Sequence, residues 1–315
     1  MEKMKTIKHI IASAGILAVA LSVSFRASAQ ESEAMAFGRV THDPVAAAMG
    51  GAGVASVTDA AYASYRNAAA IPYYEGTLDI GAGYQLWQAS GTSYMNLAGA
   101  WNENGRFGIA AGFTYGKGKS YDIYDAGGFV TGNFAPSEMQ ANIGLGWRFL
   151  PWLSLGANVK YLSNTLAEGH SYSAISSDIF LMSRLNDLSL ALGVSSLGSR
   201  VESTTGAKFS QPTSLTFGAG YLAEFAEKHS VEVLLDADWY LAGALSASLG
   251  AEYCWNRMIS VRGGYRYGGK SVIPSYASVG AGIKLIGISL DVAYLIASGD
   301  SPMQNTLAFG LGYSF

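Results

Sequence analysis

The most constraining feature of this sequence is an alternation of apolar with small or polar residues that recurs, segment after segment, from Thr77 to Phe315. In the last segment, NTLAFGLGYSF, every second residue is large and apolar, and the residues between them are small or polar. Successive side chains of a β-strand point to opposite faces, so a period of two indicates a strand with one apolar face. The pattern therefore predicts a long series of two-faced strands.

About fourteen such segments can be distinguished, and tight turns alternate with longer connections that are rich in Gly, Ser, Thr and Asn. Bacterial outer-membrane barrels have an even number of strands, short periplasmic turns and longer external loops. We therefore predict an all-β fold: a 14-stranded antiparallel transmembrane β-barrel over residues 77–315, with both chain termini on the periplasmic side. The predicted strands are 78–88, 93–102, 106–115, 138–149, 152–162, 173–184, 188–197, 213–223, 230–240, 245–255, 258–267, 276–286, 288–297 and the final segment; the longer connections are 116–137, 164–171, 198–212 and 268–275.

The charged residues of these segments share one parity, opposite to that of the large apolar residues. A charged side chain that faces lipid at the bilayer midplane costs about 2–4 kcal/mol, whereas one that faces the lumen avoids this cost. A water-soluble β-sandwich would show the opposite preference, with its charges outside. We therefore expect the following side chains to point into the barrel: Asp79, Arg148, Lys160, Asp178, Glu232, Asp236, Asp238, Glu252, Arg262, Arg266, Lys284 and Asp291.

The first residues have the pattern of a secretory signal. Three lysines precede an apolar run from Ile10 to Phe25, and Ala27-Ser28-Ala29 forms a small-residue cleavage site, so we predict a signal peptide over 1–29. The apolar run is too short to remain as a membrane-spanning helix.

Composition excludes several classes of function. The net charge of −3 gives no electrostatic basis for binding nucleic acid. Cys254 is the only cysteine, so there is no internal disulfide and no cysteine-based zinc site. The histidines show no hydrolase or metal-ligand spacing. We therefore expect a protein without catalytic residues, bound metal or cofactor.

A glycine- and alanine-rich stretch, MGGAGVASVTDAAYASYRNAAAI, runs from Met49 to Ile71. It lacks the third glycine of a dinucleotide fingerprint, the Lys-Ser/Thr of a phosphate loop and a preceding strand. The predicted lumen is lined by Gly, Ala and Ser and has room for a short-side-chained segment. We expect residues 30–76 to form a plug inside the lumen, with VTDAAYASYRN as a short helix or hairpin; the alternative is a periplasmic tail.

This stretch resembles the N-terminal motif of the FadL superfamily of outer-membrane barrels, in particular its PorV/PorQ branch. That resemblance implies a fourteen-stranded barrel with its N-terminal segment in the lumen. Arg66 and Ala68-Ala69-Ala70 stand where the family has Trp and Pro-Ala-Gly. The matching residues are Met49, Gly50, Gly51, Ala52, Asp59, Ala60, Ala63, Tyr65 and Asn67.

The lumen charges suggest two kinds of site. Glu232, Asp236 and Asp238 could supply oxygen ligands to a divalent cation, but a network of ion pairs is favoured because acids and bases are nearly balanced. The expected network comprises Asp178, Glu232, Asp236, Asp238, Glu252, Arg262, Arg266 and Lys284. General acid-base catalysis by these carboxylates stays open, since nothing fixes their spacing across strands.

Arg66 has two possible positions in the predicted plug. It could pair with Asp178 or Asp236 and hold the plug shut, or its side chain could extend to periplasmic water.

Two further sites lie at the predicted ends of the barrel. The connection 116–137 carries Tyr121, Tyr124, Phe129 and Phe134, which suits either a protein interface or a lid over the barrel mouth. The C-terminal Tyr313 and Phe315 resemble the aromatic signal by which barrel proteins are passed to the outer-membrane insertion machinery; the alternative is an ordinary last strand.

Two functions follow from the resemblance. The PorV/PorQ branch implies a non-enzymatic accessory scaffold of an outer-membrane machine for protein secretion or assembly, in contact with lipid and a larger protein complex. The wider superfamily implies a transporter of hydrophobic molecules such as long-chain fatty acids. A transport site should be lined by apolar side chains, whereas the predicted lumen is mostly Gly, Ala, Ser and charge, so the scaffold is favoured.

Overall fold

The structure is a computed structural model, and it describes residues 33–203, 206–269, 271, 273–297 and 299–315. The predicted signal peptide lies outside the described residues. No helix of the described chain is long and apolar enough to cross a membrane.

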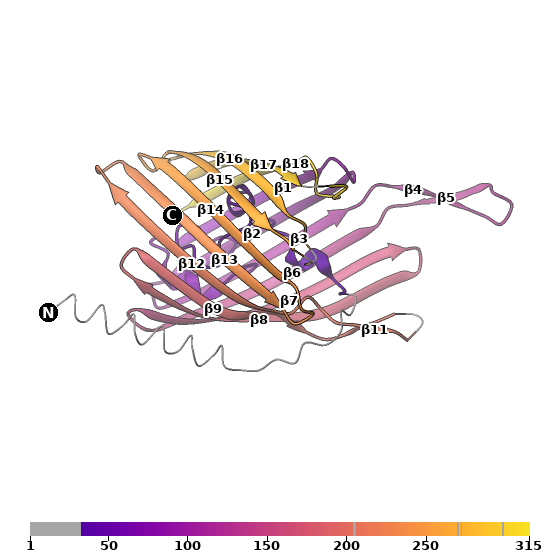
Figure 1. The fold of residues 1–315 in the computed structure, drawn as a ribbon, viewed down its shortest axis with the longest axis horizontal. Helices are drawn as coiled ribbons and strands as arrows, with labels where there is room; N and C mark the ends of the chain where they lie inside the picture. Colours follow the sequence, from indigo (N-terminus) through magenta and orange to yellow (C-terminus); the bar gives the residue numbers. More distant parts are fainter. Residues whose placement is uncertain (1–32, 204–205, 270, 272, 298) are drawn as a thin grey trace.

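Fourteen strands of the described chain form one closed antiparallel barrel, which confirms the predicted fold class (Figure 1). The ladder closes where β1 pairs with β18, from Asp79 opposite Ser314 to Trp87 opposite Thr306. The barrel strands are β1 (Leu78–Trp87), β2 (Thr92–Glu103), β3 (Phe107–Lys117), β6 (Ser137–Leu150), β7 (Leu153–Ala167), β8 (His170–Leu185), β9 (Leu188–Gly198), β12 (Ser214–Phe225), β13 (His229–Tyr240), β14 (Leu245–Trp255), β15 (Ile259–Tyr267), β16 (Tyr276–Leu285), β17 (Ile288–Ala297) and β18 (Thr306–Ser314).

The alternation of the sequence separates the two faces of the wall. Leu97, Val159 and Leu311 are 53–58% exposed on the outside, whereas Ala98, Lys160 and Ala308 are buried inside. A belt of exposed Leu, Ile, Val and aromatic side chains is stable only in contact with lipid. The outer face is therefore that of a membrane-spanning barrel.

The two ends of the barrel differ in their connections. At one end, here called the turn end, the connections are as tight as Asn104–Arg106 and Ile286–Gly287, and the chain terminates there at Phe315. The other end, the loop end, carries 118–136 and 199–213. Two small hairpins form within these loops, β4 (Tyr121–Tyr124) with β5 (Val130–Phe134) and β10 (Val201–Glu202) with β11 (Lys208–Phe209). The predicted loop 164–171 is instead mostly strand, because β7 and β8 continue to Ala167 and His170.

The N-terminal segment lies inside the barrel. It contains η1 (Ala36–Arg39), α2 (Pro44–Ala48) and η2 (Ala68–Tyr73), and many of its side chains are buried. Its first described residues pair with the loop end, where Ala34 N–H donates to the Ser210 carbonyl (2.9 Å). It leaves at the turn end, where Thr77 N–H donates to the Phe315 carbonyl (2.7 Å). We call residues 33–76 the plug.

Glu33, the first described residue of this segment, lies at the loop end, whereas Phe315 lies at the turn end. The predicted periplasmic position of the N-terminus concerns residues that lie outside the described chain. The residues VTDAAYASYRN also form neither a regular helix nor a hairpin. They make successive turns, in which Tyr65 N–H donates to Tyr62 and Arg66 N–H to Ala63. Short side chains and wall hydrogen bonds hold this backbone without a helix.

Candidate functional site

The glycine cluster of the plug packs directly on the wall formed by β14–β16. Gly50 and Gly51 have φ of 70° and 81°, a region that glycine adopts without strain. The Gly50 N–H donates to the Ser278 hydroxyl, and that hydroxyl donates to the Ala48 carbonyl (both 2.9 Å). On the wall, a Cβ at Gly250 would lie 2.5 Å from the Met49 side chain. Glycines on both surfaces therefore let two backbones meet.

Three wall carboxylates hold the plug through its backbone and hydroxyl groups. Asp236 accepts from the N–H groups of Gly53 and Val54 (2.8 and 3.1 Å), and Asp79 accepts from those of Ala60 and Ala61 (2.9 and 3.1 Å). Glu232 accepts from the hydroxyls of Ser56 and Thr58 (3.1 and 3.0 Å). These carboxylates stabilise turns that would otherwise leave donors unpaired in the lumen.

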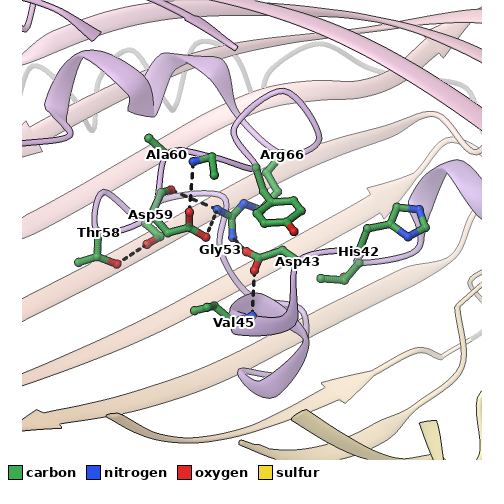
Figure 2. Close-up of polar contacts among 12 residues, drawn as sticks. His42, Asp43, Val45, Gly53, Thr58, Asp59, Ala60 and Arg66 are labelled. Atoms are coloured by element: carbon green, nitrogen blue, oxygen red, sulfur yellow. Dashed lines mark hydrogen bonds and ion pairs between the residues drawn. The ribbon is translucent and has the colours of Figure 1, made fainter. Parts of the chain in front are cut away.

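Arg66 binds other parts of the plug, and not the wall (Figure 2). Its guanidinium lies 2.5 Å from the carboxylate of Asp43 and 3.3 Å from that of Asp59, and it also donates to the Asp59 carbonyl. The predicted pairing with Asp178 or Asp236 is therefore wrong, since those carboxylates have other partners. Asp43 also caps α2 by accepting from Val45 N–H (2.8 Å). Arg66 thus joins the start, middle and end of the plug.

Tyr65 and Asn67 connect the next part of the plug to its surroundings. Lys160 donates to the Tyr65 carbonyl (3.1 Å) and pairs with Asp178 (2.5 Å). Asn67 caps η2 by accepting from Ala69 N–H (2.9 Å) and donates to the Val54 carbonyl (2.8 Å).

The remaining lumen charges form two further clusters. Asp238 lies between Arg39 of the plug (2.8 Å) and Arg266 (3.7 Å). Arg262 pairs with both Glu252 and Asp291. The predicted network is thus divided: Glu232 and Asp236 bind the plug, and no ion pair of the described residues includes Lys284. The described chain also holds no group of side chains arranged to bind a metal ion.

Sequence reasoning missed His42, Asp43 and Arg39 as plug contacts. The Asp43-Pro44 pair was an available signal, because Asp at N-cap followed by Pro is typical of a helix start. His42 is 2% exposed, and its ring lies 5.9 Å from Tyr65 and 5.4 Å from Tyr94. Burial, together with the nearby charge of Lys160, lowers the pKa of His42 to about 3, so its ring is neutral.

Toward the loop end, apolar side chains of the plug pack on the wall. Trp87 and Tyr94 pack with ring centroids 5.0 Å apart. They belong to a buried cluster that joins the plug to the wall, called here the apolar cluster: Val40, Ala47, Ala48, Trp87, Tyr94, Ile273, Tyr276, Ala293, Leu295, Ala297, Met303 and Ala308. A second cluster joins Met35 and Phe37 to Leu162.

A cavity of about 540 Å³, lined by both charged and apolar side chains, lies in the lumen toward the turn end. Gly287 and Phe315 line it at the turn end, and Asp43, Pro44 and Asp59 line it at the plug. It adjoins the wall from β12 round to β1, whereas η2 fills the side of β2, β3, β6, β7 and β8. We call it the vestibule.

The predicted interface aromatics lie on the β4–β5 hairpin, which extends beyond the barrel at the loop end (Figure 1). Phe129 and Tyr124 are 74% and 60% exposed, and Tyr121 packs on Phe134 with ring centroids 5.6 Å apart. The hairpin therefore stands away from the barrel mouth. At the other end, Tyr313 and Phe315 are exposed on the outside of β18 and just after it.

Comparison with known proteins shows the fold. No protein-family model matches the sequence, and no curated protein matches it. The toluene transporter TbuX of Ralstonia pickettii matches 86% of this chain and 98% of its own, with 14% identity and a TM-score of 0.61. The toluene transporter TodX of Pseudomonas putida covers 86% and 96%, with 14% identity and a TM-score of 0.59. The monoaromatic hydrocarbon channel CymD covers 93% and 99%, with 13% identity and a TM-score of 0.60.

Residues 77–315 make up about three quarters of the chain, so a match over 86% of it includes part of the N-terminal segment. The protein has the closed, membrane-spanning β-barrel fold of these transporters and channels.

Proposed function

We propose that the protein is an outer-membrane channel for small hydrophobic molecules. The observation that carries this proposal is the likeness of the fold, over 86–93% of this chain, to TbuX, TodX and CymD, which are described as toluene transporters or monoaromatic hydrocarbon channels. The proposal adopts the alternative that sequence analysis placed second. It requires no catalysis, and we propose that the protein is not an enzyme.

The apolar cluster is the part of the lumen best suited to such a molecule. Apolar ligands bind in sites lined by hydrophobic and aromatic side chains, and Trp87, Tyr94 and Tyr276 provide aromatic surfaces near the loop end. The same cluster contains Val40 and Ala47 of the plug. A ligand that enters it must displace these plug residues, so binding and plug movement are coupled.

Uptake of toluene and of a long-chain fatty acid tests the proposal. The protein is produced in a Gram-negative host that lacks its own channel for hydrophobic compounds, and cell-associated radiolabel is followed over time. We expect saturable uptake of one of the two, reduced about tenfold by Trp87→Ala together with Tyr276→Ala, equivalent to about 1.4 kcal/mol. Phe129→Ala on the hairpin is the control. Uptake no faster than with an empty vector contradicts the proposal.

A second function, the accessory scaffold, is favoured by one observation. The β4–β5 hairpin extends from the barrel and exposes Tyr124 and Phe129, and aromatic residues are enriched at protein interfaces. We propose that this hairpin is where a larger outer-membrane complex would bind. Purification in mild detergent, followed by mass spectrometry, should identify one partner that is lost when the four hairpin aromatics are replaced by Ser. Equal recovery of that partner with the variant contradicts the proposal.

A further inference from the structure

Five aromatic rings form an unbroken row in the lumen, from the apolar cluster to the vestibule. Each ring contacts the next with ring centroids 5.0–5.9 Å apart and ring planes tilted by 44–66°. Tilted and edge-to-face contacts at these distances are the ones that aromatic rings prefer. Trp87 belongs to the apolar cluster and Tyr62 lines the vestibule, so the row joins the two regions. We call it the aromatic row; it consists, in order, of Trp87, Tyr94, His42, Tyr65 and Tyr62.

The three tyrosines of the aromatic row are fixed through their hydroxyl groups. A hydrogen bond at the edge of a ring holds the ring in place and leaves its faces for contact with other rings. Each hydroxyl is bound by a side chain of the barrel wall. The partners are Glu138 for Tyr94 (2.7 Å), Asn96 for Tyr62 (2.7 Å) and Thr114 for Tyr65 (3.1 Å).

His42, at the centre of the row, is held in a different way. Its ring is 2% exposed, and neither ring nitrogen has a hydrogen-bond partner among the described residues. Figure 2 shows the ring turned away from Arg66. The charge of Lys160, which acts on this ring, is already balanced by Asp178 (2.5 Å). A polar group buried without a hydrogen bond costs free energy, so the imidazole is held there by ring packing alone.

The surroundings of His42 suit an apolar ring better than the imidazole that they hold. Tyr65 and Tyr94 offer aromatic contacts at 5.9 and 5.4 Å, and no described group binds the ring nitrogens. An apolar aromatic molecule such as toluene keeps these ring contacts and has no polar group to leave unpaired. A non-planar hydrocarbon of similar size is buried equally well but loses the ring-to-ring geometry.

We propose that the place of His42 in the aromatic row is a binding site for a planar, apolar aromatic ring, and that the closed plug fills this site with its own imidazole. The ligand enters from the apolar cluster past Trp87 and Tyr94, displaces His42, and continues past Tyr65 and Tyr62 to the vestibule. The inference rests on the proposed function, since it names the site and the class of molecule within the same lumen.

Binding of toluene to the purified full chain in detergent tests the proposal. Radiolabelled toluene is equilibrated by dialysis with the same detergent on both sides, and methylcyclohexane serves as the non-aromatic molecule of similar size. We expect His42→Ala to bind toluene about tenfold more tightly, because a site that is free only about a tenth of the time loses that factor in apparent affinity. His42→Phe should bind at least tenfold more weakly than the unchanged protein, because its apolar ring fills the site and leaves no polar atom unpaired.

Two controls make the comparison specific. His170→Ala and His170→Phe are the same substitutions at the exposed start of β8 and should leave the affinity for toluene unchanged. In the unchanged protein, toluene should bind at least tenfold more tightly than methylcyclohexane. Circular dichroism checks that the variants are folded. Because an emptied apolar cavity binds benzene-sized molecules in any case, the loss of affinity in His42→Phe carries more weight than the gain in His42→Ala.

Three results would overturn the proposal. Equal affinity of His42→Phe and the unchanged protein would place toluene elsewhere. Equal affinity for toluene and methylcyclohexane would mean that the site does not select an aromatic ring. Binding to His42→Ala alone would show that the substitution itself creates the site. The uptake measurement separates this inference from the channel: saturable uptake with binding that is insensitive to His42 overturns the site alone, whereas binding that depends on His42 without uptake overturns the channel alone.

Discussion

The two ends of the lumen have the same strand pattern and different contents. Toward the loop end the plug supplies Phe37 and Val40, which pack on apolar wall residues, and Arg39, which pairs with Asp238. Toward the turn end it supplies Asp43 and Arg66, and a cavity remains that is also lined by acidic residues of the wall. The plug and the wall that faces it therefore change in character together along the lumen.

The largest effect is expected where the plug packs on the wall. A Cβ at Gly264 would collide with the backbone of Met49 and Gly50, and main-chain atoms cannot move aside as a side chain does. We expect Gly264→Ala to lower the free energy of unfolding by more than about 3 kcal/mol, beyond the usual cost of overpacking. Guanidinium unfolding measures this. In the neighbouring Gly263→Ala, the nearest atom to the new Cβ is 3.9 Å away, so its stability should be unchanged. Equal losses of stability in Gly264→Ala and Gly263→Ala would show that the plug does not pack against the wall at Gly264.

The next effect concerns the plug above the vestibule. Arg66→Met leaves the carboxylates of Asp43 and Asp59 without their cation, and loss of one partner of a buried pair costs about 3–5 kcal/mol. We expect a loss of about 3 kcal/mol in the same unfolding measurement, at the lower end of this range because the Asp59 side chain is 20% exposed. Arg257→Met, which breaks an exposed pair with Glu224, should cost less than about 1 kcal/mol. Similar losses for both variants would mean that the ion pairs above the vestibule are solvated.

A smaller effect tests whether water reaches the buried ring of His42 in the lumen. The pKa of His42 is lowered to about 3, below the value of about 6.5 in an unfolded chain. The folded state therefore binds fewer protons than the unfolded state between these pH values. The contribution of neutral His42 to the free energy of unfolding is fully present above pH 6.5 and is lost as the pH falls toward 3, by up to about 1.4 kcal/mol per pH unit.

His42→Phe should reduce this slope, whereas His170→Phe at the exposed start of β8 should not. The measurement is the unfolding free energy at several pH values between 7 and 4. A slope that persists in His42→Phe would mean that other groups cause the acid sensitivity.

The smallest effect is expected at the hairpin. Replacing residues 120–134 by a short Gly-Ser turn removes β4 and β5, which lie outside the barrel ladder. Because surface changes away from buried contacts are usually within about 0.5 kcal/mol, thermal unfolding should be nearly unchanged. A large loss of stability would show that the hairpin helps to close the loop end.

The barrel could be predicted from the sequence because strand alternation is a local property. Ser314 and Leu311 differ in face only because of their parity, and each of the fourteen ladders repeats that rule. The plug was harder to predict because its conformation depends on distant partners. Its residues 54–66 form turns where Asp79, Asp236 and Glu232 accept their donors, and no spacing along the chain reveals that these acids come from β1 and β13.

The partners of Arg66 illustrate the same limit. The alternation of the sequence predicted that many acidic side chains point into the lumen. It could not show whether Arg66 pairs with an acid of the wall or with Asp43 and Asp59, which lie within the plug itself. The Asp43-Pro44 pair marked a helix start, and only the three-dimensional arrangement brings that carboxylate to Arg66.

The path of the N-terminal segment, from Ser210 at one mouth to Phe315 at the other, limits how the lumen can be cleared. The segment passes through the barrel from one mouth to the other and is covalently joined to β1 at the turn end. Because β1 follows the plug directly and pairs with β18, the barrel closes around the plug. Clearing the lumen would therefore require the segment to move along the barrel axis toward the turn end, where it is joined to β1.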